Sequence, residues 1–248
     1  MCCNLFTLWR RELAAYFLSP IAYLVLLSFL VLNGVSFLLM VNFMDSRATD
    51  ASVMQSFFNT FFYWVAMLFV VPVITMKLFA EEKRMGTLET LMTAPVSDAS
   101  VVQSKFLGAI TFFAIMWLPT VAYAGILNYF AKDATPIDWG PVCAAYGGTL
   151  LVGLLYISLG LMASSITHNQ IVAAIVGFVL IAVIFFLGFL SRIGPPWVQA
   201  FFGYLASVEH MSDFARGQID LRRVLFYISA TVFILFVTQK IVESRKWR

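Results

Sequence analysis

The sequence predicts an all-α integral membrane protein with six transmembrane helices. Of its 248 residues, 61% are hydrophobic and only 12% are charged, and the mean hydropathy is +0.89, well above that of a soluble domain. Crossing a hydrocarbon layer of ~30 Å takes roughly 20 apolar residues at about 1.5 Å each, and six runs without Asp, Glu, Lys or Arg suit this role. The runs are continuously apolar, not alternating. This favours helices over a barrel, because a helix satisfies its own backbone hydrogen bonds in lipid.

Before the first run, helical spacing over residues 4–18 predicts an amphipathic helix that lies at the membrane interface. Trp9 falls on its apolar face, while Arg10 and Arg11 fall on the polar one, and Ser19 and Pro20 end it. Such a helix either anchors the protein at the level of the lipid headgroups or also touches a cytoplasmic partner. Both interpretations stay open.

The membrane parts of the six runs are expected at about residues 21–43, 57–76, 106–130, 141–167, 171–191 and 224–240. The fourth and fifth runs form a tight hairpin around a polar turn made of Thr167, His168, Asn169 and Gln170. The sixth run is short, and its length is made up if the flanking Arg and Lys side chains extend to the two surfaces. We find no linker and no internal repeat, so residues 1–248 are expected to form one domain.

The distribution of Lys and Arg predicts the orientation of the chain. Six spans place both termini on the same side of the membrane, and ten of the 16 Lys and Arg residues fall on that side. The termini, the loop around residues 77–105 and the His168 turn should therefore be cytoplasmic, in a multi-pass protein of the inner (plasma) membrane. This bias accounts for the net charge of +3, so no nucleic-acid partner is implied. Cys2 and Cys3 lie on the reducing side and Cys143 lies within a span, so no disulfide is expected.

The one strongly charged passage, residues 77–97, has its own predicted structure. Residues 77–85 continue the second helix, with Lys77 and Glu81 at the i, i+4 spacing and Glu81 and Arg84 at i, i+3. Gly86 then stops this helix, and Thr87 caps a short second helix over residues 88–93. This passage is either a lever through which a cytoplasmic motor moves the spans, or a solvated loop that only enforces topology.

A further segment, residues 195–223, is expected to be structured on the outer side. Residues 197–208 are apolar enough to lie at or re-enter the interface, and Gly217 marks a later turn.

Three groups of residues carry a resemblance to a known family. The first is Phe79-x-Glu81-Glu82-Lys83-Arg84-x-Gly86-Thr87-Leu88-Glu89, followed by Pro95-Val96-Ser97; the second is Ser164, Ser165, Thr167, Asn169 and Gln170; the third is His210, Phe214, Arg216, Gly217, Ile219 and Asp220. Together they resemble the six-span permeases of the ABC type 2 exporter superfamily, of the gliding-motility or nitrous-oxide-reductase-maturation type. The resemblance covers essentially the whole chain, and the first group is its most specific part.

The resemblance implies a connecting helix at the N-terminus, a coupling helix after the second span, short outer helices before the last span, and assembly of two permeases with two ATPase subunits. The coupling residues would then be Phe79, Glu81, Glu82, Lys83, Arg84, Gly86, Thr87, Leu88, Glu89 and Pro95. Homodimer or heterodimer, the cargo, the identity of the ATPase and an extracytoplasmic accessory subunit stay open. The outer segment would serve as a gate.

The sequence itself argues that the energy source is external. It contains no Gly-Lys dipeptide and hence no phosphate-binding loop, so ATP and Mg²⁺ would be bound by a partner subunit, and the chain is expected to be neither an enzyme nor a cofactor-binding protein. A compact bundle of six helices leaves little room for a large substrate, which favours a route between two bundles. Small residues such as Gly147, Gly148, Gly153 and Gly160 would allow close contact between helices, within the fold or between copies.

Three other classes of function compete with an exporter permease. A secondary transporter would usually carry an ionisable side chain inside a span, and the six predicted spans contain none. An intramembrane enzyme is disfavoured because His168 and His210 are the only histidines and lie far apart in sequence. A non-transporting membrane scaffold remains an alternative that composition does not exclude.

Overall fold

The computed structural model describes residues 2–45, 53–87, 97–130, 138–190 and 195–244. Within them every regular element is helical, and six helices are long and apolar enough to cross a membrane: Pro20–Asn42, Phe61–Arg84, Asp98–Tyr129, Trp139–Ile166, Gln170–Phe189 and Leu221–Ser244. The predicted fold class, an all-α protein with six membrane-spanning helices, is therefore confirmed.

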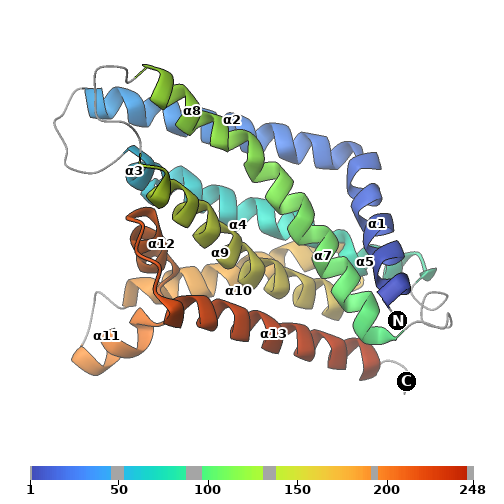
Figure 1. Ribbon diagram of the computed structural model, residues 1–248. Coiled ribbons are helices and arrows are strands. Elements are labelled where there is room, and N and C mark those ends of the chain that lie inside the picture. Colours follow the sequence, from blue (N-terminus) through green and yellow to red (C-terminus); the bar gives the residue numbers. More distant parts are fainter. Residues whose placement is uncertain (1, 46–52, 88–96, 131–137, 191–194, 245–248) are drawn as a thin grey trace.

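The elements follow one another in a simple order. They are α1 (Cys2–Leu18), α2 (Pro20–Asp45), α3 (Val53–Asn59), α4 (Phe61–Thr75), α5 (Lys77–Arg84), α7 (Asp98–Trp117), the 3₁₀ turn η1 (Leu118–Thr120), α8 (Val121–Phe130), α9 (Trp139–Ile166), α10 (Gln170–Leu190), α11 (Pro196–Gly203), α12 (Ser207–Ala215) and α13 (Leu221–Ser244). The long helices lie side by side (Figure 1). Helices α1 and α5 and the C-terminal end of α13 lie at one end of the bundle, which we call the α5 end, and α3, α11 and α12 lie at the opposite end (Figure 1).

Helix α9 is the centre of the bundle. It is the most buried of the six candidate spans and packs against α4, α7, α10, α12 and α13. Its glycines make this packing possible: a Cβ on Gly153 would lie 2.5 Å from the ring of Phe113, and one on Gly160 would lie 2.1 Å from the hydroxyl of Thr75. The small residues at these positions are therefore used within the fold.

Three helices start at places other than the predicted ones. The helix of the third span begins at Asp98 instead of near residue 106, because Ser97 caps it by accepting a hydrogen bond from the backbone N–H of Ser100. The second span begins at Phe61, because extended backbone at Thr60 separates α3 from α4. The last span begins at Leu221, next to an Asp220 carboxylate that accepts a hydrogen bond from the N–H of Arg222.

Helix α1 turns sharply away from α2 at Ser19 (Figure 1). It crosses α7 at Gly108, where the Cβ of Glu12 approaches closely. On either side of this crossing, the indole N–H of Trp9 donates to the hydroxyl of Thr111 at 3.1 Å, and the ring of Tyr16 stacks on Phe112 at 4.8 Å. The predicted apolar face of this helix is thus partly occupied by α7. A position at the membrane interface stays a prediction.

Candidate functional site at the junction of α1, α5 and α7

Helix α5 is fixed to the end of α9 by a serine. The N–H groups in the first turn of a helix have no partner inside that helix. Here the Oγ of Ser164 accepts from the N–H groups of Phe79 and Ala80, at 3.0 and 3.1 Å, and donates to the carbonyl of Met76 at 3.0 Å. One turn further along α5, the ammonium of Lys83 donates to the backbone carbonyl of Ser165. Phe79 and Ser164 are therefore in direct contact, although they are 85 positions apart in sequence.

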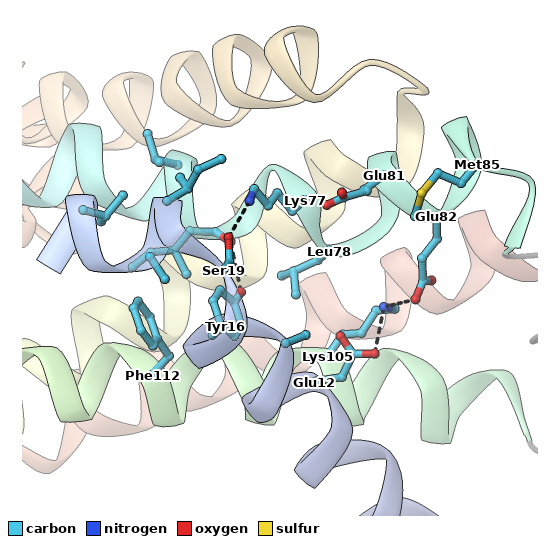
Figure 2. A pocket seen from close by; sticks show the side chains of 16 residues that line it. Glu12, Tyr16, Ser19, Lys77, Leu78, Glu81, Glu82, Met85, Lys105 and Phe112 are labelled. Carbon is cyan, nitrogen blue, oxygen red and sulfur yellow. Dashed lines mark hydrogen bonds and ion pairs between the residues drawn. The ribbon is translucent and has the colours of Figure 1, made fainter.

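Four charged side chains, which we call the charge cluster, join α5 to α1 and α7. The Nζ of Lys105 lies 3.1 Å from an oxygen of Glu12 and 2.7 Å from an oxygen of Glu82 (Figure 2). The guanidinium of Arg11 lies 3.1 and 3.7 Å from the same two oxygens. Cations and carboxylates therefore alternate, and the formal charges of the cluster sum to zero.

The charge cluster lies largely inside the protein. Exposed fractions are 2% for the side chain of Lys105, 11% for Glu12 and 20% for Glu82, whereas Arg11 is 53% exposed. Removing a charge from water is costly unless it is paired and hydrogen-bonded. Each inner member therefore depends on the others, and the three helices are held in one relative position.

Sequence reasoning missed both Glu12 and Lys105, and it counted Lys105 only among the positive charges that set the orientation. A helical pattern could have found both. Glu12 follows Trp9 by three residues and precedes Tyr16 by four, so it lies within the apolar stripe of α1. Lys105 likewise lies within the stripe of α7 that contains Val101 and Ala109. Lys105 stands one residue before the predicted third span and is 1% exposed, so a buried ionisable group lies in the helix that contains this span, although the predicted span itself has none.

The other predicted coupling residues fall into three settings. Phe79 is fully buried, and Glu81 lines a cavity beside the charge cluster. Arg84, Gly86 and Thr87 are exposed at the free end of α5, where Gly86 has φ +70° and terminates the helix as predicted. Leu88, Glu89 and Pro95, together with the predicted short helix over residues 88–93, lie outside the described residues.

The charged residues at the i, i+4 and i, i+3 spacings along α5 do not pair with one another in the structure. Among the described residues, neither Lys77 with Glu81 nor Glu81 with Arg84 forms an ion pair, and the ammonium of Lys77 instead donates to the hydroxyl of Ser19 at 3.1 Å. The packing of α1 and α2 beside α5 offers Lys77 this partner, which local spacing cannot reveal.

The polar turn of the predicted hairpin lies next to this junction. Thr167, His168 and Asn169 connect α9 to α10, and Gln170 is the first residue of α10. The side-chain oxygen of Asn169 accepts from the N–H of Ile171 at 2.9 Å and so caps α10. Of the predicted residues of the N-terminal helix, Trp9 contacts α7, Arg11 joins the charge cluster and Arg10 is exposed.

The third group of residues lies at the opposite end of the bundle (Figure 1). Phe214 of α12 packs on Gly148 of α9, where a Cβ would lie 2.6 Å from its ring. The ring of His210 is buried, with Nδ1 3.1 Å from the hydroxyl of Tyr227. Burial, and then the nearby Arg223, lower the pKa of His210 to about 4, so this imidazole is neutral at physiological pH.

Comparison with known proteins identifies the family of the chain. A family model described as ABC-2 family transporter protein matches residues 36–247, which is most of the chain. No curated protein matches the chain. The match includes Glu82 and Lys105 of the charge cluster but begins after α1. The chain therefore belongs to the ABC-2 family of transporter proteins, as a multi-pass membrane permease.

Proposed function

We propose that this chain is the permease subunit of an ATP-driven exporter and that it couples ATP hydrolysis by a separate cytoplasmic ATPase to substrate movement across the membrane. The observation that carries the proposal is the attachment of α5. The C-terminal end of α5 is exposed from Arg84 to Thr87, while the residues just before it, Phe79 to Lys83, are bonded to α1, α7 and α9, and the helix continues α4.

This attachment suits a lever. Hydrogen bonds that involve a charged group contribute about 1.5–3 kcal/mol each, and α5 takes part in several of them with different helices. A force on the exposed end of α5 would therefore displace several spans together instead of bending the helix alone. A solvated loop that only enforced topology would have no need of a buried lysine at its base.

The orientation is part of the proposal. The excess of Lys and Arg favours a cytoplasmic position for the α5 end, at which α1 begins and α13 ends (Figure 1). Helices α11 and α12 would then face outward, in the inner (plasma) membrane. An ATPase that binds and hydrolyses ATP with Mg²⁺ would dock at the exposed end of α5, as the family membership suggests.

A second permease copy, identical or paralogous, is the other partner that we propose. The interior of a single bundle is filled by large side chains, among them the fully buried Tyr63, Phe113 and Tyr156. A substrate path through one copy would have to displace them, whereas a path between two copies would not. The gliding-motility or nitrous-oxide-reductase-maturation type, and an extracytoplasmic accessory subunit at the end formed by α11 and α12, complete the proposal.

Cysteine cross-linking on the native complex tests both the partner and the orientation. In a background with the three native cysteines replaced by serine, Arg84→Cys should cross-link to an ATP-hydrolysing subunit. Ile219→Cys, which is 66% exposed and lies beyond α12 at the opposite end, is the matched control and should not. A membrane-impermeant maleimide added to intact cells should label Ile219→Cys and leave Arg84→Cys unlabelled.

Two results would overturn the proposal. One is labelling of Arg84→Cys from outside the cell, which would reverse the orientation. The other is a purified complex that contains the permease but hydrolyses no nucleotide, which would favour the scaffold alternative.

A further inference from the structure

A cavity of about 320 Å³ lies between the α1–α2 turn and the α4–α5 junction (Figure 2). Part of its lining is apolar and includes Ala22 and Val25 of α2, Val73 and Ile74 of α4, and Phe112 of α7, while Glu12, Glu82 and Lys105 of the charge cluster also line it. Its volume is at the lower end of the roughly 300–1,000 Å³ that is typical of ligand pockets. It can hold a headgroup together with the first segment of one acyl chain, but not a whole lipid.

The rim of the cavity carries one cation and one carboxylate that the charge cluster does not neutralise. Lys77 and Glu81 lie one helical turn apart on α5, and both are half-buried (Figure 2). In the described part of the chain, no carboxylate lies within ion-pair distance of Lys77 and no cation lies within that distance of Glu81. Ser19 adds a hydroxyl beside the ammonium of Lys77.

The cavity adjoins an exposed apolar surface of α2. Ile21 lines it and is 47% exposed, and Tyr23 and Leu24, which follow on this helix, are 57% and 69% exposed. An apolar chain that leaves the cavity would therefore continue over an apolar surface. Because Pro20 begins the first candidate span, the rim also lies at the depth expected for headgroups.

We propose that this cavity binds a phospholipid whose headgroup carries both a phosphate and a primary ammonium. The phosphate is held by Lys77 and Ser19, the ammonium donates to Glu81, and part of one acyl chain packs against Ala22, Val25 and Phe112. A phospholipid with an anionic headgroup would bring its negative charge to Glu81 without the ammonium that this carboxylate requires. The lipid is a resident ligand of the α2–α5 junction, and its binding does not depend on the transport function.

Native mass spectrometry of the purified complex, with added phosphatidylethanolamine or phosphatidylglycerol, measures this binding. Lys77→Gln should weaken retention of phosphatidylethanolamine about tenfold, the effect of losing one charge-assisted contact. Ala22→Phe, which fills the apolar wall, should reduce it further. The matched controls are Lys240→Gln, an exposed lysine at the same end of the bundle, and Ala14→Phe, an exposed alanine of α1; both should bind as the parent chain does.

Glu81→Gln provides a sharper test, because the side chain is half-buried and the change is small. This variant should lose the preference for phosphatidylethanolamine over phosphatidylglycerol by binding the first lipid more weakly and the second more strongly.

Three results would overturn the proposal. The first is that Lys77→Gln and Ala22→Phe retain phosphatidylethanolamine as well as the parent chain does. The second is that the parent chain binds phosphatidylethanolamine and phosphatidylglycerol equally well. The third is that soluble phosphoethanolamine displaces the lipid at matched concentration. The last result would assign the cavity to a soluble phosphorylated ligand.

Discussion

Replacing Lys105 by Met removes the cation at the centre of the charge cluster while keeping the length and apolar stem of the side chain. The carboxylates of Glu12 and Glu82, which now share the ammonium at 3.1 and 2.7 Å, would face each other without it. Removing one partner of a buried ion pair costs about 3–5 kcal/mol. Glu82 is one-fifth exposed and Arg11 still touches both carboxylates, so we expect a smaller loss of about 2–3 kcal/mol in the free energy of unfolding.

Thermal unfolding of the detergent-purified permease measures this loss through the fluorescence of its six tryptophans. For chains of this size, each kcal/mol shifts Tm by roughly 2–4 °C, so Lys105→Met should lower Tm by roughly 4–12 °C. Lys240→Met is the matched control. Lys240 is 56% exposed and pairs with an exposed Glu243, so its loss should change stability by less than about 1 kcal/mol.

A triple variant separates loss of charge from loss of packing. If Lys105→Met is combined with Glu12→Gln and Glu82→Gln, no uncompensated charge stays buried, and most of the lost stability should return. A single variant as stable as the control would show that the cluster does not hold the helices. A triple variant no better than the single one would show that the stem of Lys105, not its charge, matters.

Three further predictions follow from the packing. Ser164→Ala removes the oxygen that accepts two N–H groups of α5 and should cost about 1–3 kcal/mol in the same assay; an unchanged Tm would contradict the proposed attachment. Gly148→Ala should cost about 1–3 kcal/mol because its Cβ meets an aromatic ring, whereas Gly147→Ala, which meets nothing within 4 Å, should be neutral or slightly stabilising; equal effects would refute this packing. Since the pKa of His210 is lowered from 6.5 to about 4, its neutral form stabilises the fold fully above pH 6.5, and about 2–3 kcal/mol is lost as the pH falls toward 4. When unfolding is compared at neutral pH and at about pH 4.5, His210→Gln should lose less stability at the lower pH than the parent chain does. An equal loss of unfolding free energy in the two proteins would contradict this role of His210.

The fold was predictable because its main determinants are local in sequence. Long apolar runs, the proline after Ser19 and the stop at Gly86 each depend on a few neighbouring residues, and the structure places helices and breaks accordingly. The errors are also local. The cap at Ser97 makes the helix of the third span start eight residues earlier than predicted. The extended backbone at Thr60 separates α3 from α4, so the second span starts later than predicted.

The candidate site was predictable only in part, because it depends on which helices become neighbours. The motif around Glu82 and the serines near the hairpin were both noticed, yet nothing in the sequence states that Ser164 accepts from the N–H of Phe79. Lys105 was counted as a topological charge, although a lysine within an apolar helical stripe implies a buried partner. The partner, Glu12, is 93 residues away, and only the crossing of α1 over α7 brings the two together.

The geometry also argues that α1 moves with α5, although the family match begins only after α1. Helix α1 is attached to the α4–α5 unit at two points on either side of Met76. The hydroxyl of Tyr16 donates to the carbonyl of Ile74 at 3.0 Å, and the charge cluster links Glu12 to Glu82. A rotation of α5 about Met76 would leave the hydrogen bond between Tyr16 and Ile74 in place and would pull on the charge cluster. Either α1 then moves with α5, or a buried ion pair of the cluster breaks. Because separating a buried ion pair is costly, movement of α1 together with α5 is favoured. Helix α2 continues from α1 through the Ser19 turn and is therefore displaced as well.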